Sequence, residues 1–321
     1  MKAVRFHQPG GPEVLQYEEV NDPQPGPGQA LVEIQAVGVN MADVGGRKGA
    51  HLSALPMIAG QEAAGLVTAV GDGVTEVAIG DLVAYRGAPG AYAERQAVAS
   101  RLLVKLPEGS DARTGAAAMH QGICAHFLCH TTYPLKAGNS CLIHAGAGGV
   151  GLLLIQMAKR LGAFVIATVS TNEKAQLATE AGADKAIIYT QEDFQEEVMK
   201  ATDGKGVEVV YDSVDKDTFL KSLASLTHFG CLVLYGHASG YIGEISPEIF
   251  QPGSKYLARP GIADFVATRE DLLWRTGDVF NWVLSGELKL RIGHEFPLSE
   301  AAEAHRQLEA RATTGKLLLI P

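Results

Sequence analysis

The sequence predicts an α/β protein in which a doubly wound parallel sheet is inserted between two pieces of a β-rich domain. Three observations lead to this prediction. Short apolar runs separated by glycine turns fill roughly the first 120 residues, whereas helical patterns alternate with apolar runs between residues 140 and 235. Near the start of this second region stands Gly146-x-Gly148-x-x-Gly151, placed between an apolar run and a helical pattern.

The composition is that of a well-buried globular protein. The chain has 321 residues, which is enough for two domains. Of these residues, 46% are hydrophobic and 20% are charged. A net charge of −9 and the lack of any lysine/arginine run argue against a nucleic-acid partner. The longest mainly apolar stretch is far shorter than a membrane span, and residues 1–7 lack a signal-peptide pattern. Four cysteines without Cys-x-x-Cys spacing favour a reduced, cytoplasmic protein.

The β-rich region is predicted to form a small barrel-like domain. Its first two strands are expected to pair across the Gly10-Gly11-Pro12 turn, and the proline-rich loop 21–28 cannot sustain a strand ladder. Strands are expected at 1–7, 15–20, 30–39, 64–70, 82–85, 91–96 and 102–106.

The inserted region alternates strands with helices, which predicts right-handed crossovers within one parallel sheet. Strands are expected at 140–143, 164–169, 186–189, 207–212 and 231–235, and helices at 116–130, 149–161, 172–181 and 193–201. Beyond it come a helix at 270–284, a strand at 288–292, a helix at 300–310 and a strand at 316–320. This tail is too small to be a domain, so we expect it to return to the first one. The expected domains are therefore 1–124 and 125–262, with 263–321 completing the first.

The glycine pattern is the fingerprint of a dinucleotide site. The first glycine permits a tight turn, the second lets backbone approach a pyrophosphate, and the third lets the helix pack close to the strand. The free N–H groups of the helix N-terminus favour negative charge there. We therefore expect the segment Gly148-Gly149-Val150 to bind the cofactor phosphates.

The end of the second strand of the inserted region predicts which dinucleotide binds. Enzymes that use NAD usually place an acid there to hold the ribose hydroxyl. Here the strand runs into Ser170 and Lys174, with no acid at the tip. One charge-assisted hydrogen bond contributes roughly 1.5–3 kcal/mol, so Lys174 alone favours NADPH by roughly tenfold to a hundredfold. Glu173 is expected to point to solvent as a first-turn helix acid.

Short motifs along the whole chain carry a family resemblance. They are Gly10-Gly11-Pro12-Glu13-Val14-Leu15, Val39-Asn40-x-x-Asp43, Gly60-x-Glu62-x-Ala64-Gly65, Gln121-Gly122, the stretch from His144 to Gly151, Tyr211-Asp212-Ser213-Val214 and Arg311-x-Thr313-Thr314-Gly315-Lys316. With them the chain resembles the quinone oxidoreductases, the zeta-crystallin-like branch of the medium-chain dehydrogenase/reductases. The resemblance implies a GroES-like catalytic domain, an inserted Rossmann domain, a returning C-terminal segment and a homodimer.

The resemblance also implies site residues. Lys174 and Tyr189 would hold the phosphate of NADPH, and Asn40 would lie near the nicotinamide. The remaining cofactor channel would be lined by Ser213, Tyr235, Gly236 and Arg311. The substrate pocket would contain Asn40, His51 and Gln121. No acid or base is assigned.

The metal ligands of the zinc-dependent relatives are replaced in this sequence. Those relatives usually carry cysteine where Asn40 stands and histidine where Gln61 stands, and both changes remove a strong zinc ligand. No cysteine precedes Cys124, so a four-cysteine zinc lobe is absent. His126, Cys129 and His130 could share a metal on a helix, but without a fourth ligand we favour a packed segment. No metal is therefore expected.

Departures from the family pattern bear on the substrate. Gly45 and His51 stand where the family usually has tyrosines, which predicts a wider pocket and a more mobile loop around Gly45-Gly46. His51 could donate a proton or be merely exposed, and we favour exposure. Asp215 stands where the family often has glycine.

The predicted reaction is metal-free hydride transfer from NADPH to a quinone, in which the protein mainly positions the reactants and excludes water. Reduction of an activated carbon–carbon double bond in enones or enals uses the same geometry, and one-electron quinone reduction is related. A non-catalytic NADPH sensor or an RNA-binding protein is the alternative of another class, and the acidic net charge disfavours RNA.

Overall fold

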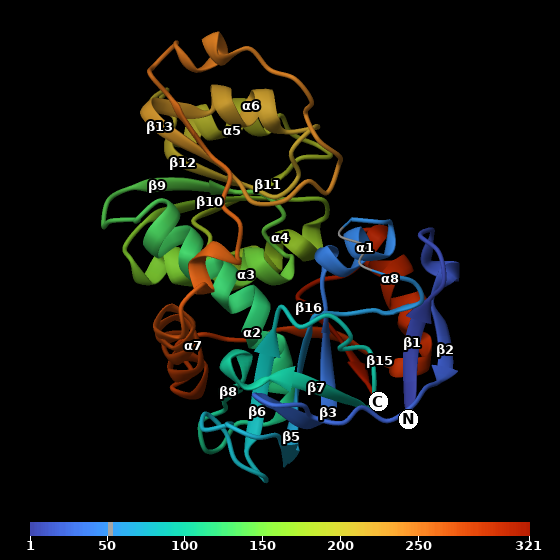
Figure 1. The fold of residues 1–321 in the computed structure, drawn as a ribbon. Helices are drawn as coiled ribbons and strands as arrows, with labels where there is room; N and C mark the ends of the chain where they lie inside the picture. The colour runs from blue at the N-terminus through green and yellow to red at the C-terminus, as the bar shows by residue number, and fades with distance from the viewer. Residues whose placement is uncertain (51–53) are drawn as a thin grey trace. The chain divides into compact units, whose positions relative to one another are not determined.

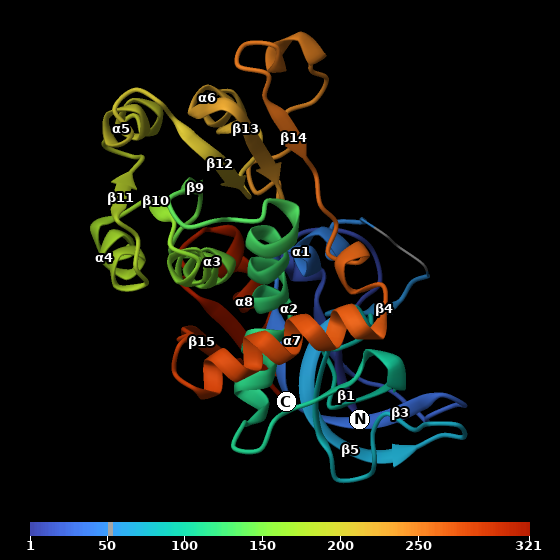
Figure 2. The same cartoon turned by 90° about the vertical axis from the view of Figure 1, so that its left-hand side faces the viewer.

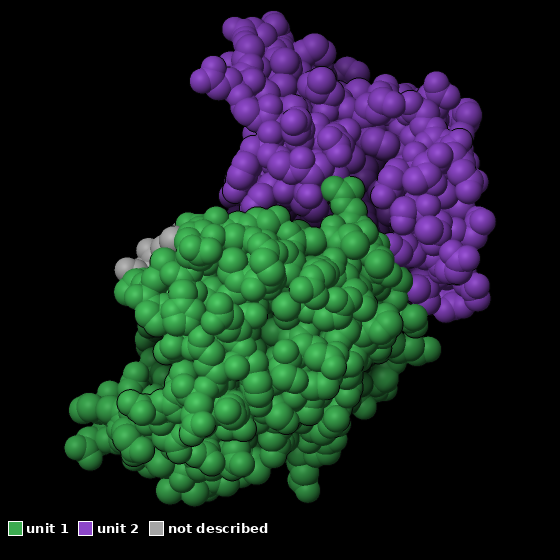
Figure 3. Space-filling view, turned by 90° about the vertical axis from the view of Figure 1, so that its right-hand side faces the viewer, with its two compact units in different colours: residues 1–121, 267–321 green, residues 122–266 purple. Residues whose placement is uncertain are grey.

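The computed structural model describes residues 1–50 and 54–321, which divide into two units. Unit 1 contains residues 1–121 and 267–321, and unit 2 contains residues 122–266 (Figure 3). The chain therefore passes from unit 1 into unit 2 and returns, with both termini in unit 1 (Figure 1). The divisions fall after residues 121 and 266, where the sequence predicts boundaries after 124 and 262.

Unit 1 is built on a seven-stranded sheet, in which β15, β16, β3, β5, β6 and β8 follow one another and β7 also pairs with β3. A second sheet has the order β2-β1-β4. The strands are β1 (Lys2–Phe6), β2 (Gln16–Glu19), β3 (Gln29–Val39), β4 (Met57–Ile58), β5 (Glu62–Val70), β6 (Leu82–Arg86), β7 (Arg95–Ala99), β8 (Val104–Lys105), β15 (Ile292–Pro297) and β16 (Lys316–Ile320). Alternation along β3 buries Ala30, Val32 and Ile34 in the core of this unit.

The returning tail completes the first sheet. Strand β16 pairs antiparallel with β3, with Leu317 opposite Val39 and Leu319 opposite Val37. Its residues Leu317 and Leu319 join the same core as the inner face of β3. Residues of the tail therefore share a sheet and a core with β3.

The helices of the chain follow the predicted pattern with some differences. They are α1 (Met41–Arg47), α2 (Ala112–Phe127), α3 (Gly149–Arg160), α4 (Asn172–Glu180), α5 (Phe194–Ala201), α6 (Phe219–Ala224), α7 (Arg269–Leu284) and α8 (Ala301–Glu309). A π-helical turn at Leu128–Thr132 follows α2. Helix α1 contains Gly45 and Gly46, so the predicted mobile loop at these glycines is wrong.

Unit 2 is a doubly wound domain around one parallel sheet in the order β11-β10-β9-β12-β13-β14. The strands are β9 (Ser140–Ile143), β10 (Phe164–Val169), β11 (Lys185–Ile188), β12 (Val207–Asp212), β13 (Leu226–Leu234) and β14 (Tyr256–Ala258). Helices α3 and α4 cover one face of the sheet, and α5 and α6 cover the other (Figures 1 and 2). The strand order reverses between β9 and β12, which is where ligands bind in sheets of this kind. The predicted α/β fold class is confirmed.

Two predicted strands are displaced along the chain. The strand expected at 91–96 is β7 (Arg95–Ala99), because the N–H of Ala93 turns back to the carbonyl of Ala91. The strand expected at 288–292 is β15 (Ile292–Pro297), because the N–H of Leu288 donates to Trp282 and closes the end of α7.

All four cysteines lie buried as thiols, at positions 124, 129, 141 and 231. Burial raises the pKa of Cys129 and of Cys141, and it raises the pKa of Cys231 to about 11. None of the helices described here is long and apolar enough to cross a lipid bilayer.

Candidate functional site

The turn between β9 and α3 carries the glycine fingerprint. Its left-handed residue is Ala145, at φ +54°, whereas Gly146 does not adopt a positive φ. A side chain on Gly146 would instead place its Cβ 2.8 Å from Cβ of Ala167 on β10. The first glycine therefore makes room for the neighbouring strand.

The third glycine allows the close packing that the sequence predicts. A Cβ on Gly151 would lie 2.3 Å from the carbonyl oxygen of Ala145 and 2.9 Å from Cα of Gly146. Gly148 precedes the first turn of α3 and, like Gly149 and Val150, is partly exposed. Because the first N–H groups of a helix have no intrahelical partner, this turn offers donors to an anion. The cradle fits a dinucleotide pyrophosphate.

The carboxyl ends of β10 and β11 bring Ser170 and Tyr189 together. The N–H of Tyr189 donates to Val169 at 3.1 Å, and the Thr190 hydroxyl donates to the Ser170 carbonyl at 3.0 Å. Lys174 stands in the first turn of α4, which begins after Thr171. A cation is electrostatically disfavoured at a helix N-terminus, and partial burial lowers the pKa of Lys174. The geometry therefore suits an anion at this strand end.

Glu173 is the acid closest to Lys174 in sequence, and its carboxylate is hydrogen-bonded at the N-terminus of α4. Its carboxylate accepts hydrogen bonds from its own backbone N–H and from the Thr171 hydroxyl, and these lower its pKa. The side chain is exposed, as predicted.

The ends of β12 and β13 bring Ser213, Tyr235 and Gly236 together. The Tyr235 N–H donates to Asp212 at 2.9 Å, and the Tyr235 hydroxyl is hydrogen-bonded to Ser213. Burial raises the pKa of Tyr235, while the Ser213 hydrogen bond opposes this. A Cβ on Gly236 would lie 2.7 Å from the Ser213 carbonyl, so only glycine allows this approach.

Asp215 connects the same two strand ends. It is buried, and its carboxylate accepts from Arg259 and from the N–H of Ile242, each at 3.2 Å. The sequence flags Asp215 only as a departure from the family pattern and provides no signal for its partners.

A buried histidine under the fingerprint links β9, β10 and β12. Ser222 donates to Asp212 at 2.8 Å, so it accepts from Nε2 of His144 at 2.9 Å. Nδ1 of His144 then accepts from the Thr168 hydroxyl at 2.8 Å. Burial lowers the pKa of His144, which keeps the ring neutral. This network supports the fingerprint turn, and sequence reasoning missed it because its members lie far apart in the chain.

In unit 1, Asn40 belongs to a buried cluster with Glu62 and Lys316. The Asn40 amide donates to Glu62 Oε2 at 2.7 Å and accepts from Lys316 Nζ at 2.9 Å. Lys316 also bonds Glu62 Oε2 at 2.5 Å, and the N–H of His120 donates to Glu62 Oε1 at 2.5 Å. Gln121 follows His120 on α2 and is half-buried. Sequence reasoning assigned no role to Glu62 or Lys316, although a lysine leading an apolar strand is a usable signal.

A second buried chain starts at the backbone of Asn40. Its N–H donates to Asp43 Oδ2 at 2.8 Å, and the Tyr92 hydroxyl reaches the same oxygen at 3.4 Å. Nδ1 of His305 faces the Arg47 guanidinium at 3.1 Å, so Nε2 donates to the Tyr92 oxygen at 2.9 Å. Burial raises the pKa of Asp43 to about 7 and lowers that of His305 to about 3.

The structure describes Arg311 and the segment from His126 to His130 among the remaining predicted residues. Arg311 is exposed after α8, in a left-handed conformation at φ +56°. His51 lies outside the described residues. The rings of His126 and His130 stack at 4.3 Å, and Nδ1 of His130 lies 3.2 Å from the Cys129 sulfur.

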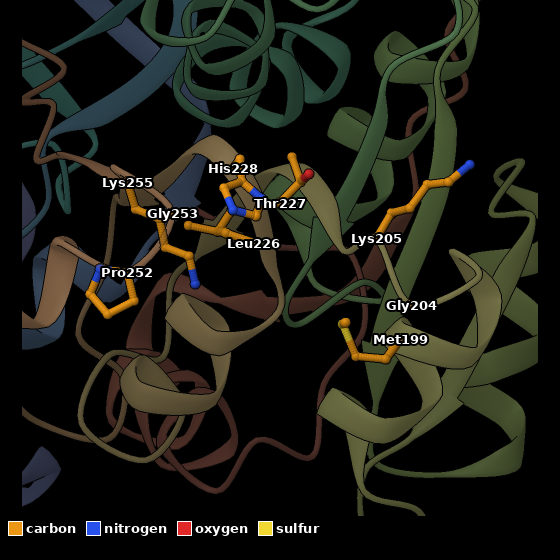
Figure 4. Close-up of a pocket in the computed structure, with 9 residues that line it drawn as sticks. All are labelled: Met199, Gly204, Lys205, Leu226, Thr227, His228, Pro252, Gly253 and Lys255. Atoms are coloured by element: carbon orange, nitrogen blue, oxygen red, sulfur yellow. The ribbon is translucent and has the colours of Figure 1, made fainter.

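One pocket of unit 2 lies at the amino ends of the strands, opposite the fingerprint turn. It has a volume of about 500 Å³ and is lined by Met199, Gly204, Lys205, Leu226, Thr227, His228, Pro252, Gly253 and Lys255 (Figure 4). Lys205 precedes β12, and Thr227 and His228 begin β13. Because ligands in doubly wound sheets bind at the carboxyl ends, we do not assign the cofactor to this pocket.

Comparison with known proteins places the whole chain among oxidoreductases. Residues 26–108 match the family described as alcohol dehydrogenase GroES-like domain, and residues 149–256 match the family described as zinc-binding dehydrogenase. The chain is 42% identical to a quinone oxidoreductase of Pseudomonas aeruginosa, over 100% of this chain and 99% of that protein. It is 38% identical to a 2-haloacrylate reductase of a Burkholderia species, over 99% and 98% of the two chains. The solved structure of Escherichia coli quinone oxidoreductase complexed with NADPH matches with a TM-score of 0.97 and 39% identity, covering 100% of both chains.

The zinc named in one of these family descriptions does not fit the residues present. The oxygen of the Asn40 amide and one oxygen of Glu62 already bind the Lys316 ammonium, and this positive charge would repel a divalent cation. Across residues 1–50 and 54–321, no group of three or more histidine, cysteine or carboxylate side chains is arranged to hold a metal ion. No step of the reaction is therefore routed through a metal.

Proposed function

Because the chain belongs to the quinone oxidoreductase family of the medium-chain dehydrogenase/reductases, we propose that it transfers hydride from NADPH to a quinone without a metal ion. The observation that carries the choice of cofactor is the strand end where Ser170 and Tyr189 meet close to Lys174. Its lysine sits in a helical turn that disfavours a cation, and a phosphate would relieve this.

Each predicted cofactor residue has a proposed task toward the cofactor, which supplies the hydride when bound. The segment Gly148-Gly149-Val150 binds the pyrophosphate through backbone N–H groups. Lys174, Ser170 and Tyr189 hold the 2′-phosphate. The remaining channel is lined by Ser213, Tyr235, Gly236 and Arg311, with Asn40 near the nicotinamide.

The acceptor pocket is proposed to include Asn40, Gln121 and His51. Reduction of a quinone gives a resonance-stabilised oxyanion, so a general acid is not required. The protein's contribution is then to orient the two reactants and to exclude water, and orientation alone accounts for large accelerations. An orienting role agrees with the Asn40 side chain, whose amide oxygen and NH₂ group are both hydrogen-bonded.

A second candidate reaction is reduction of an activated carbon–carbon double bond. The 38% identical Burkholderia protein is named for a haloacrylate, which contains such a bond. In this reaction hydride adds to one carbon of the double bond, and the enolate that results takes a proton at the neighbouring carbon. One-electron reduction to a semiquinone is a further outcome of the same test.

We also propose that the protein is a cytoplasmic homodimer. Strand β14 lies at the edge of the unit 2 sheet, where Tyr256 is 59% exposed and Leu257 41% exposed. An exposed strand edge with apolar side chains is a favourable surface for pairing with a second copy.

The test is to follow NADPH absorbance with purified protein and a panel of quinones and enones. Turnover of quinones with NADPH, faster than with NADH and unaffected by a chelator, is expected. Turnover of enones alone would move the assignment to the second candidate. Superoxide formed in step with NADPH loss would indicate one-electron transfer. Tight NADPH binding without turnover of any acceptor would favour a sensor and overturn the proposal.

A further inference from the structure

Lys316 is a buried lysine whose ammonium group is hydrogen-bonded to Asn40 and Glu62. It is 2% exposed, and its partner Glu62 is 0% exposed. Lysine is almost never buried to this extent unless it is paired, because removing the charge from water is costly. Glu62 therefore supplies the opposite charge that a buried lysine needs. The third member of the cluster is Asn40.

That third member, Asn40, has both ends of its amide specified by the ion pair. Its oxygen accepts from the ammonium of Lys316, and its NH₂ group donates to the carboxylate of Glu62. Rotation of the amide by half a turn would set NH₂ against the ammonium and oxygen against the carboxylate. Both contacts would be repulsive, so the charges select one orientation of an otherwise two-fold group.

The fold makes a dedicated space for this arrangement. Lys316 begins β16, Glu62 begins β5, and Asn40 follows β3, the strand that lies between the other two in the sheet. A Cβ on Gly38 would lie 2.2 Å from Glu62 Oε2 and 2.7 Å from Lys316 Nζ. Glycine at position 38 is thus required for the ion pair to lie across β3.

We propose that Lys316 and Glu62 are positioning residues for hydride transfer, which they serve by holding the Asn40 amide in one orientation. This inference rests on the proposed function, since it assumes that Asn40 lies beside the reacting groups. The side chains of the ion pair are buried, so we assign them no direct contact with the cofactor or the acceptor. The ion pair is proposed to affect hydride transfer only through Asn40. Removing Asn40 should therefore abolish this effect, whereas a purely structural role of the ion pair would persist.

The test is a double-mutant cycle with Lys316→Met and Asn40→Ala. Lys316→Met is expected to lower kcat roughly tenfold to a hundredfold, as expected for a displaced positioning group, with little change in the Kd of NADPH. In the Asn40→Ala background the same substitution should change kcat by less than about threefold, because its target is gone. Multiplicative effects of the two substitutions on kcat would overturn the inference.

Two further variants separate positioning from folding. The double variant Lys316→Met/Glu62→Gln leaves no unpaired charge in the interior. It is therefore expected to fold even if Lys316→Met alone does not. It should show the same loss of kcat, and normal kcat in this folded variant would overturn the inference. Arg275→Met removes a different buried cation of unit 1 and should keep wild-type kcat. A wild-type protein that reduces no acceptor would refute the proposed function and this inference with it, whereas active wild type with multiplicative effects would refute the inference alone.

Discussion

Arg259 donates to the carboxylate of Asp215 across 3.2 Å while Asp215 holds a left-handed backbone conformation at φ +72°. The same carboxylate accepts from the N–H of Ile242, and the guanidinium also reaches the carbonyl of Gly236 at 3.4 Å. The pair thereby ties the turn after β12 to the loop after β13. These are the segments that carry Ser213 and Gly236.

Replacing Asp215 should loosen both segments. Asp215→Ala leaves the Ile242 N–H without its acceptor, which costs about 1–3 kcal/mol of unfolding free energy, and it should weaken NADPH binding severalfold. Asp215→Asn keeps an acceptor and should lose less. Urea unfolding and NADPH fluorescence titration measure the two effects. The exposed neighbour Asp217, replaced by alanine, should change stability by less than about 0.5 kcal/mol.

Lys174→Ala should alter cofactor preference. Loss of one charge-assisted hydrogen bond raises the Michaelis constant for NADPH roughly tenfold to a hundredfold, and leaves that for NADH nearly unchanged. Steady-state kinetics with both cofactors tests this, with Lys200→Ala on α5 as a control for removing an exposed lysine. Equal changes with NADPH and NADH would contradict the assignment of the phosphate to this strand end.

Two glycines of the fingerprint should respond differently to alanine. Gly151→Ala forces Cβ to 2.3 Å from a backbone oxygen, and overpacking of this kind costs about 1–3 kcal/mol or more. Gly148→Ala meets the same oxygen at 3.2 Å, so its stability loss should be smaller. Thermal unfolding compares them, and Gly277→Ala, which has open space within α7, should stabilise the protein. Equal losses at positions 148 and 151 would contradict the packing role of the third glycine.

Asp43 should make stability fall as pH rises from about 4 to about 7. Burial raises its pKa to about 7, against the hydrogen bond from the Asn40 N–H and the charge of Lys316. The unfolded carboxyl titrates near pH 3.9, so in this window the folded protein holds one more proton than the unfolded chain. The full effect is on the order of 4 kcal/mol.

Asp43→Asn should remove this slope, because asparagine keeps an acceptor for Asn40 without a titrating proton. Urea midpoints measured from pH 4.5 to pH 8 compare the two proteins. Parallel pH profiles would show that Asp43 is ionised throughout in the folded state.

Strong local patterns made most of unit 2 predictable from the sequence. The fingerprint glycines and the alternating strands were specified by residues next to one another, as in β10, whose predicted bounds 164–169 match the structure. Helix α1 is not predicted because Gly45 and Gly46 disfavour helix, although the hydrogen bond from the Asn40 N–H to Asp43 that begins it is a local capping interaction between residues three positions apart. The sequence predicts a strand from Leu288, although the N–H of Leu288 bonds back to Trp282 in the last turn of α7.

The candidate site was predictable only in part, for a physical reason. Ser170, Lys174 and Tyr189 follow from where strands end, which a sequence pattern reveals. Lys316 and Glu62 are 254 positions apart and meet only when β16 and β5 flank β3. Asp215 and Arg259 likewise meet through a loop whose path no local pattern determines.

The burial of every cysteine has a consequence for an enzyme that handles quinones. Quinones are electrophiles that arylate thiolates, and the reactive species is the ionised sulfur. Cys124, Cys129, Cys141 and Cys231 are inside the protein, and burial holds the pKa of Cys231 at about 11, so that little of it ionises at neutral pH. The fold thereby protects the protein from covalent inactivation by its own proposed substrate, without any need for a scavenging thiol.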